Sequence, residues 1–170
     1  MTSPHVAQSI LETSGVASSK AQGLLEEATH GADDGELYLE RSESEALAFD
    51  DGRLKAANFD VTEGFGLRVV AGETAGFAHA AEISTASIER AGQAAALAKR
   101  GRAGVAADAP RATNRALYGD DDPLAAPDFA EKIALLQEID AYARARDPRV
   151  VQVSANLAAE RRQIEILRAD

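Results

Sequence analysis

The stretch from Ala46 to Asn58 reads Ala-Leu-Ala-Phe-Asp-Asp-Gly-Arg-Leu-Lys-Ala-Ala-Asn and decides how the centre of this chain folds. Gly52 follows two aspartates, and glycine supplies the positive φ that a tight hairpin turn requires. We therefore predict that residues 46–49 and 53–58 pair as an antiparallel hairpin, with Asp50-Asp51-Gly52 as its turn.

Further strands are expected on both sides of this hairpin. Alternation of apolar and polar residues begins near residue 36, so the first strand is longer than the hairpin itself. Residues 64–70 and 75–81 alternate in the same way around a turn at 71–74. The centre of the chain is thus predicted to be a meander of about four antiparallel strands over residues 36–82.

Four segments have apolar residues at helical spacing, namely residues 4–13, 18–30, 84–100 and 127–145. The expected buried faces are Ala21, Leu24, Leu25 and Ala28 in the second segment, Ile88, Ala91, Ala95 and Ala98 in the third, and Ile133, Leu136, Ile139 and Ala143 in the fourth. Ser18 or Ser19 is expected to cap the second segment and Ser84 the third, and Pro127 opens the fourth, as at many helix starts.

The predicted fold class is α+β, with an antiparallel meander and a C-terminal hairpin packed against three to four helices. At 170 residues the chain has the length of one domain, 1–170. Its expected parts are a helical segment at 1–35, the meander at 36–82, a helix at 83–100, a loop at 101–126, a helix at 127–147 and a hairpin at 149–168. Because no turn or cap follows the last strand, we expect Asp170 to interrupt a longer fold.

Composition narrows the class of protein. The net charge of −10 disfavours a nucleic-acid binder, which needs clustered Lys and Arg against phosphates. The chain has no cysteine, so it holds neither a disulfide nor a thiolate metal site, as suits a reducing compartment. Its first residues lack the basic and apolar regions of a signal peptide, and no apolar run reaches membrane-spanning length. We expect a cytoplasmic protein without a membrane partner.

No catalytic or metal-binding residue can be nominated from the residues themselves. His5, His30 and His79 are far apart, and none has a second ligand at the spacing of a helical zinc site. His79 is expected to be an ordinary strand histidine. No Gly-x-Ser-x-Gly elbow occurs, so a serine hydrolase is disfavoured as well.

The acidic segments are interpreted as solvated surface. Residues 119–122 read Gly-Asp-Asp-Asp but lack the spacing and final glutamate of an EF-hand. Glu40, Glu43 and Glu45, with Arg41 among them, are expected on the solvent face of a half-buried sheet.

Six glycines lie within or between the predicted strands rather than before a helix, where a phosphate loop would place them. We interpret them as turn or strand glycines that serve bulges, turns and close packing, and they are Gly35, Gly52, Gly64, Gly66, Gly72 and Gly76.

Several segments together resemble the N-terminal half of the TldD/PmbA family, also called the modulator of gyrase family. Three of them are Gly35-Glu-Leu-Tyr-Leu-Glu-Arg-Ser, Phe49-Asp-Asp-Gly-Arg-Leu-Lys and Glu63-Gly-Phe-Gly-Leu-Arg-Val-Val. The others, similar to the TldD branch in order and spacing, are Gly72-Glu-Thr-Ala-Gly-Phe-Ala-His-Ala, Leu117-Tyr with Asp122-Pro-Leu, and Asp147-Pro-Arg-Val-Val-Gln-Val-Ser-Ala. The resemblance covers residues 31–170.

This resemblance implies that the intact protein is a zinc-dependent peptidase for small or unfolded peptides, working as a homodimer or with a PmbA/TldE-type subunit. In the family, zinc is held by a His-Glu-x-x-x-His helix and a cysteine of the C-terminal half, and the N-terminal part contributes to the dimer and the substrate chamber. Since neither motif occurs here, no catalytic or metal-binding role transfers to any residue.

Two rival interpretations follow from the same residues. The chain is alternatively a free-standing, non-enzymatic module that binds a peptide or a protein. The second rival is a DNA- or gyrase-binding protein, and the acidic composition disfavours this interpretation.

Overall fold

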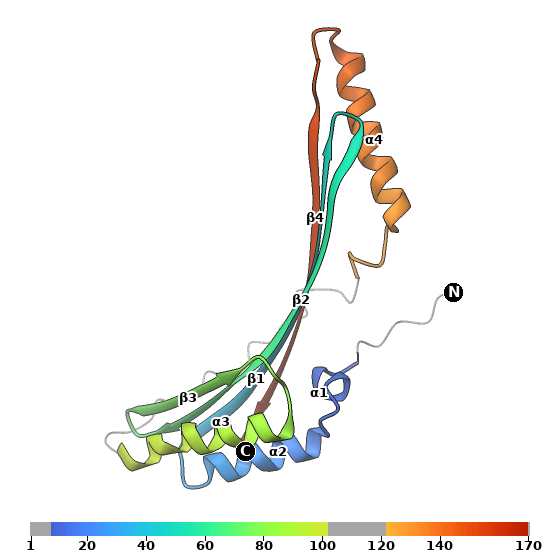
Figure 1. The fold of residues 1–170 in the computed structure, drawn as a ribbon. Helices are drawn as coiled ribbons and strands as arrows, with labels where there is room; N and C mark the ends of the chain where they lie inside the picture. Colours follow the sequence, from blue (N-terminus) through green and yellow to red (C-terminus); the bar gives the residue numbers. More distant parts are fainter. Residues whose placement is uncertain (1–7, 102–121, 170) are drawn as a thin grey trace. The chain divides into compact units, whose positions relative to one another are not determined.

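A computed structural model describes residues 8–101 and 122–169 of the chain. The α+β class is confirmed: the described residues form a four-stranded antiparallel sheet and four α-helices (Figure 1). The elements are α1 (Ile10–Thr13), α2 (Ser18–Thr29), β1 (Asp34–Asp50), β2 (Arg53–Ala71), β3 (Thr74–Ala80), α3 (Thr85–Ala95), the 3₁₀ helix η1 (Ala96–Gly101), α4 (Phe129–Arg146) and β4 (Ser154–Arg168). The strand order is β3-β2-β1-β4.

The chain divides into two compact units, although its length alone suggested one domain. The first unit contains described residues 8–41, 63–101 and 163–169, and the second contains 42–62 and 122–162. Strands β1, β2 and β4 contribute residues to both units, and each unit is described by itself below.

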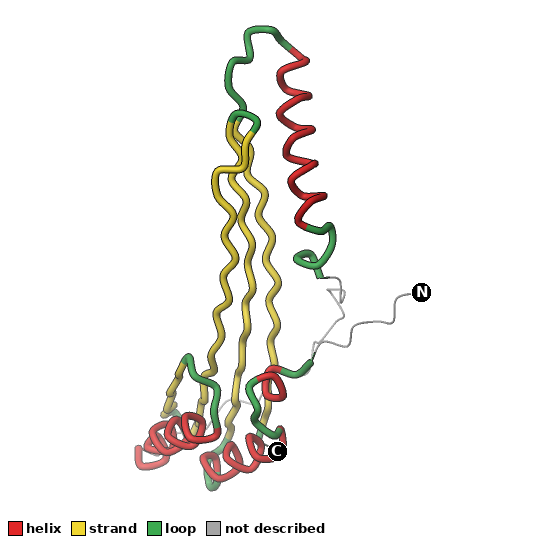
Figure 2. Tube along the Cα trace, turned by 45° about the vertical axis from the view of Figure 1, so that its right-hand side comes forward, coloured by secondary structure: helices red, strands yellow, loops and turns green. Residues whose placement is uncertain are grey.

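The first unit has the main hydrophobic core. Helices α2 and α3 lie side by side against the sheet (Figure 2). The sheet supplies alternate residues of β1 and β2 to this core, as a strand with one buried face does. The core consists of Ile10, Leu11, Val16, Ala21, Leu24, Leu25, Ala28, Leu37, Leu39, Phe65, Leu67, Val69, Ile83, Ile88, Ala91 and Ala95. The predicted face of α2 is confirmed, as is that of α3 up to Ala95.

Strand β3 pairs with β2 and forms one edge of the sheet. It is antiparallel, with Phe65 opposite Ala80 and Ala71 opposite Thr74. Gly72 has a φ of +61° in the turn, and its N–H donates to the Asp33 carboxylate at 2.6 Å. A glycine is favoured at such a turn because other residues are strained at positive φ.

The second unit is built from β1 residues 42–50, β2 residues 53–62, β4 residues 154–162 and helix α4. Its hairpin turn has positive φ at both central residues, +50° at Asp51 and +74° at Gly52, as a type I′ turn requires. The fully buried core is small: Leu47, Phe49 and Leu136. Polar contacts must therefore contribute much of the attachment of α4.

Two predicted strand breaks are wrong. Residues 53–58 and 64–70 belong to one strand, β2, which continues through the polar segment between them. The hairpin predicted at 149–168 is a single strand, β4. Its alternate residues are exposed along the whole length, so the charged segment in its middle fits the period of a strand instead of interrupting it.

Helix boundaries and one helix face also differ from prediction. Helix α1 begins only at Ile10, and the helix predicted to residue 100 becomes 3₁₀ after Ala95. In α4 the predicted face is wrong in part: Leu136 is buried, but Ile139 is 43% exposed. The loop predicted at 101–126 lies outside the described residues from 102 to 121. None of the described helices is both long and apolar enough to cross a membrane.

Candidate functional site

The most unusual group of side chains in the second unit is the polar layer under α4, which includes a buried lysine. Lys132 keeps only 3% of its side-chain surface exposed, and its ammonium group pairs with the Glu45 carboxylate of β1. It also donates to the Leu124 carbonyl at 3.0 Å. A buried ammonium requires such partners, since its desolvation is otherwise costly. Helix α4 is thus oriented by an ion pair as well as by Leu136.

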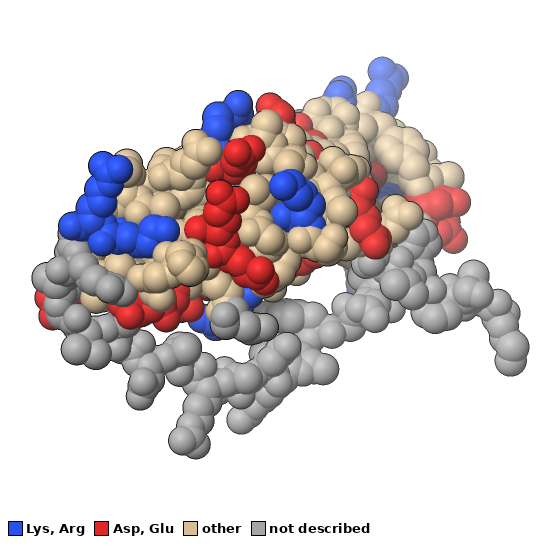
Figure 3. All heavy atoms as spheres, turned by 90° about the horizontal axis from the view of Figure 1, so that it is seen from below, with Lys and Arg blue, Asp and Glu red and all other residues tan. Residues whose placement is uncertain are grey.

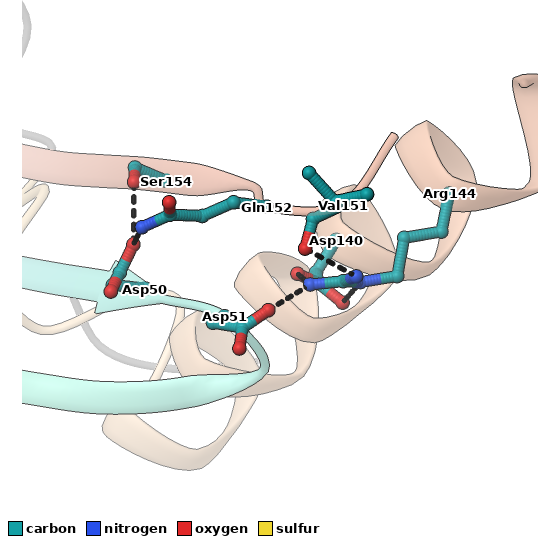
Figure 4. A network of polar contacts seen from close by, with 7 residues as sticks. All are labelled: Asp50, Asp51, Asp140, Arg144, Val151, Gln152 and Ser154. Atoms are coloured by element: carbon teal, nitrogen blue, oxygen red, sulfur yellow. Dashed lines mark hydrogen bonds and ion pairs between the residues drawn. The ribbon is translucent and has the colours of Figure 1, made fainter. Parts of the chain in front are cut away.

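A second anchor joins the C-terminal end of α4 to the hairpin turn (Figure 4). The Arg144 guanidinium donates to Asp140 at 2.9 Å, to Asp51 of the turn and to the Val151 carbonyl at 3.4 Å. Both carboxylates raise the pKa of Arg144, with Asp140 the larger cause. One planar guanidinium therefore connects the helix, the turn and the segment before β4.

Asp50 is the third polar anchor and lies beside the same turn (Figure 4). Its carboxylate accepts hydrogen bonds from Ser154 at 2.6 Å and from Gln152 at 3.0 Å. These bonds favour the charged form, so the pKa of Asp50 lies below its ordinary value of 3.8, with Ser154 the larger cause. Asp50 thereby holds the start of β4 to the end of β1.

The expected solvent face of β1 needs correction. Glu45 faces Lys132, and Glu43 lies 3.8 Å from Arg161, which also pairs with Asp122 at 3.4 Å. Glu43 and Glu45 are two residues apart and so lie on the same face of β1, whereas Glu40 lies on the opposite face. The Glu40 carboxylate accepts a hydrogen bond from Tyr38. The β1 glutamates are therefore structural partners as well as surface groups.

The candidate histidines do not meet among the described residues. His5 lies outside them. His30 follows α2 and is exposed, and its carbonyl accepts from Lys99 at 3.2 Å. His79 is exposed on β3, where its ring stacks on Phe77 with centroids 5.7 Å apart. Of the acidic segment 119–122, only Asp122 is described.

The six glycines lie in strands or turns of the described chain. Gly35 is in β1, Gly64 and Gly66 are in β2, and Gly76 is in β3. Gly52 and Gly72 are the turn glycines with positive φ. A Cβ at Gly66 would lie 2.9 Å from the Phe77 ring, so the ring rests directly over this glycine.

The described part of the chain offers no set of side chains that could bind zinc. No three His, Cys, Asp or Glu side chains converge there in a way that could hold a metal ion. Every buried side-chain nitrogen or oxygen in the described residues has a hydrogen-bond partner. The polar layer under α4 can therefore fix a helix in place, but no poised base or nucleophile can be assigned in it.

One hollow of about 160 Å³ lies between α2 and α3 in the first unit. Its floor is apolar and its rim carries exposed carboxylates, and it is lined by Leu24, Glu27, Ala28, Glu89, Gly92, Gln93 and Ala96.

On the face seen in Figure 3, basic and acidic side chains occur among uncharged ones, and Lys and Arg form no continuous patch.

Comparison with known proteins assigns the chain to a family. Residues 35–99 match the PmbA/TldA metallopeptidase domain 1, and residues 122–170 match the PmbA/TldA metallopeptidase central domain. The chain belongs to the PmbA/TldD family. Each matched region falls in a different part of the sequence, so both the N-terminal and the central family domains are represented.

Curated relatives of this PmbA/TldD chain are similar along nearly all of it. A protein named Metalloprotease TldD homolog from Haemophilus influenzae is 31% identical over 171 residues, covering 98% of this chain and 35% of the relative. A protein of the same name from Buchnera aphidicola subsp. Schizaphis graminum is 29% identical over 169 residues, with the same two coverages. The chain thus spans about a third of the length of these relatives.

Solved structures share the fold. TldE from Thermococcus kodakarensis aligns with a TM-score of 0.61 and 14% identity, covering 86% of this chain and 34% of that one. A protein described as a modulator of DNA gyrase, from Bacteroides thetaiotaomicron, aligns with a TM-score of 0.61 and 15% identity, covering 88% and 36%. These likenesses confirm the family fold.

Sequence reasoning missed Lys132 and Arg144. A lysine within an apolar helix stripe is usually read as surface. Two features of the sequence pointed to this ion pair. Lys132 lies among apolar positions of its helix, and the strand glutamates alternate in step with Leu47 and Phe49, which puts them on the same face of the strand.

Proposed function

We propose that this chain is a non-catalytic part of a zinc-dependent TldD-type peptidase that acts on small or unfolded peptides. The observation that carries the proposal is the match of residues 35–99 and 122–170 to two metallopeptidase family domains, together with TldD homologues at 98% coverage of the chain. In this proposal the implied zinc is held by residues of the C-terminal half, as the family resemblance implies.

In this proposal the chain contributes to dimerisation and to the chamber that encloses the substrate, either as a homodimer or with a PmbA/TldE-type subunit. Several large apolar side chains of the second unit are exposed instead of packed in its small core, including Phe59, Tyr142 and Val151. These exposed side chains support a role in association. The mixed charge on the face in Figure 3 favours a protein or peptide partner over nucleic acid. The absence of cysteine fits work in the cytoplasm.

The coding sequence that follows codon 170 tests this proposal at once. A His-Glu-x-x-x-His segment and a late cysteine are expected there. A stop codon directly after Asp170 would contradict the proposal and favour a free-standing binding module.

A further inference from the structure

The chain contains two aspartates that are followed by glycine, and the fold treats them differently. Both stand in the same tripeptide, Asp33-Asp34-Gly35 and Asp50-Asp51-Gly52. An aspartate before glycine is prone to cyclise, because glycine has no side chain to hinder the approach of its amide nitrogen. Since the two tripeptides are identical, a difference in their reactivity reports mainly on the fold.

Ring closure joins the glycine amide nitrogen to the side-chain carboxyl carbon of the aspartate. The nitrogen loses its proton, the protonated carboxyl loses its hydroxyl group, and one water molecule leaves behind a five-membered succinimide ring. Water then adds to one of the two ring carbonyls and opens the ring. One opening restores aspartate, and the other gives isoaspartate, in which the main chain runs through the side-chain carbon. The reaction needs no oxidant, reductant or cofactor.

The hairpin turn leaves room for this reaction at Asp51. Its side chain is 59% exposed. Apart from the chain neighbours, no atom lies within 4 Å of the place that a Cβ of Gly52 would occupy. Among the described residues no backbone hydrogen bond holds the Gly52 N–H. The attacking nitrogen is therefore accessible without the movement of a packed element.

The second Asp-Gly pair is enclosed in β1. A Cβ at Gly35 would overlap the Thr29 methyl group and lie 3.2 Å from the Arg68 carbonyl oxygen. The Gly35 carbonyl also accepts a hydrogen bond from the Ala169 N–H at 3.1 Å. Ring closure at Asp34 thus requires β1 to separate from its neighbours, and such local opening is rare in a packed core.

Two contacts restrain Asp51 in the folded chain. Its N–H donates to the Val153 carbonyl at 2.9 Å, and its carboxylate pairs with the Arg144 guanidinium (Figure 4). Only the second contact holds the group that reacts. The carboxyl carbon reaches the Gly52 nitrogen after the carboxylate has left the guanidinium, so this ion pair must break first.

We propose that Asp51 is a site of spontaneous isoaspartate formation and that Arg144 of α4 restrains the reaction. Isoaspartate adds one carbon to the main chain of a two-residue turn, whose geometry fixes the register of the hairpin. It also moves the carboxylate that Arg144 binds. The modification therefore weakens the attachment of α4 to the turn.

Mass spectrometry of the 170-residue chain, kept in warm, near-neutral buffer and sampled over weeks, tests the proposal. Trypsin releases residues 21–41 and 42–53 as separate peptides, so each holds one Asp-Gly pair. Electron-transfer fragmentation then locates isoaspartate within each peptide. In urea the two sites should react within about threefold of each other, whereas in the folded chain Asp51 should react at least about tenfold faster than Asp34.

Two variants separate the ion pair from a general loosening of α4. Arg144→Gln removes the pair and should raise the rate at Asp51 about fivefold, the factor that an exposed ion pair contributes. Asp140→Asn is the matched control, because Asp140 pairs with the same guanidinium at 2.9 Å from within α4 and its loss leaves the contact with Asp51 in place. The rate at Asp51 in this control should stay within about twofold of wild type.

Three results would overturn the proposal. The first is a ratio of folded to unfolded rate at Asp51 that is no greater than the ratio at Asp34. The second is an Arg144→Gln variant that forms isoaspartate at the wild-type rate. The third is an equal increase in Arg144→Gln and Asp140→Asn, which would assign the effect to the helix end and not to the ion pair.

Discussion

The ammonium group of Lys132 on α4 pairs with the carboxylate of Glu45 on β1, with side-chain exposures of 3% and 15%. This pair sits beside Leu136, one of the three buried residues in the small core of the second unit. Removing one partner of a buried pair leaves the other charge desolvated, which costs more than the pair itself contributes.

We expect Lys132→Ala to lower the free energy of unfolding by about 3 kcal/mol, measured by urea denaturation. The double variant Lys132→Met with Glu45→Leu should recover most of that loss, because it removes both charges and fills the space with apolar atoms. A single-variant cost below about 1 kcal/mol would show that the pair is solvated in solution.

The sequence predicted the parts of the fold that depend on local pattern. The turn at Asp51-Gly52 follows from backbone sterics, and the buried face of α2 follows from helical spacing. The face of α4 was predicted wrongly in part because its orientation depends on Glu45, a residue of a distant strand. No periodicity within α4 contains that information.

The missing strand breaks have a similar cause. A hairpin was predicted at 149–168, yet its middle is part of the single strand β4, where Arg161 faces Glu43 while its two neighbours are exposed. A charged run is compatible with a strand when a partner strand supplies the opposite charge. The polar contacts of α4 with the strands could not be predicted, since they depend on pairs far apart in sequence.

Two glycines of β2 should respond differently to alanine. A Cβ at Gly64 would lie 2.9 Å from the Ala80 carbonyl oxygen, which belongs to the backbone of the neighbouring segment. Gly64→Ala should therefore cost about 1–3 kcal/mol of unfolding free energy. Gly66→Ala should cost at most about 1 kcal/mol, because the Phe77 ring over it is 65% exposed and can move aside.

Thermal and urea unfolding of the two variants under one buffer gives this comparison directly. Equal costs, or a larger cost at Gly66, would contradict the close approach of the backbone at Gly64.

Acid should weaken the second unit through Asp50. Its folded-state pKa lies below the ordinary value of 3.8 because Ser154, and then Gln152, donate to the carboxylate. A depressed folded pKa contributes stability above the unfolded pKa, and this contribution is lost as the pH falls through the folded value. The loss is therefore expected below about pH 4.

NMR titration of the Asp50 carboxyl carbon measures this pKa in the folded chain. Ser154→Ala should move the pKa upward toward 3.8 and remove part of the stability difference between pH 5 and pH 3. Ser44→Ala is a suitable control on the same sheet, and its Asp50 titration should match wild type. An Asp50 pKa at or above 3.8 in the wild type would contradict the contacts at the hairpin turn.

Peptide hydrolysis by the 170-residue chain and by the gene product read to its stop codon, assayed side by side with zinc and an unfolded peptide, tests the central claim most directly. The account predicts cleavage by the longer protein that a chelator abolishes, and none by the 170-residue chain. Cleavage by the 170-residue chain, or none by the longer protein even with a PmbA/TldE-type subunit added, would contradict it.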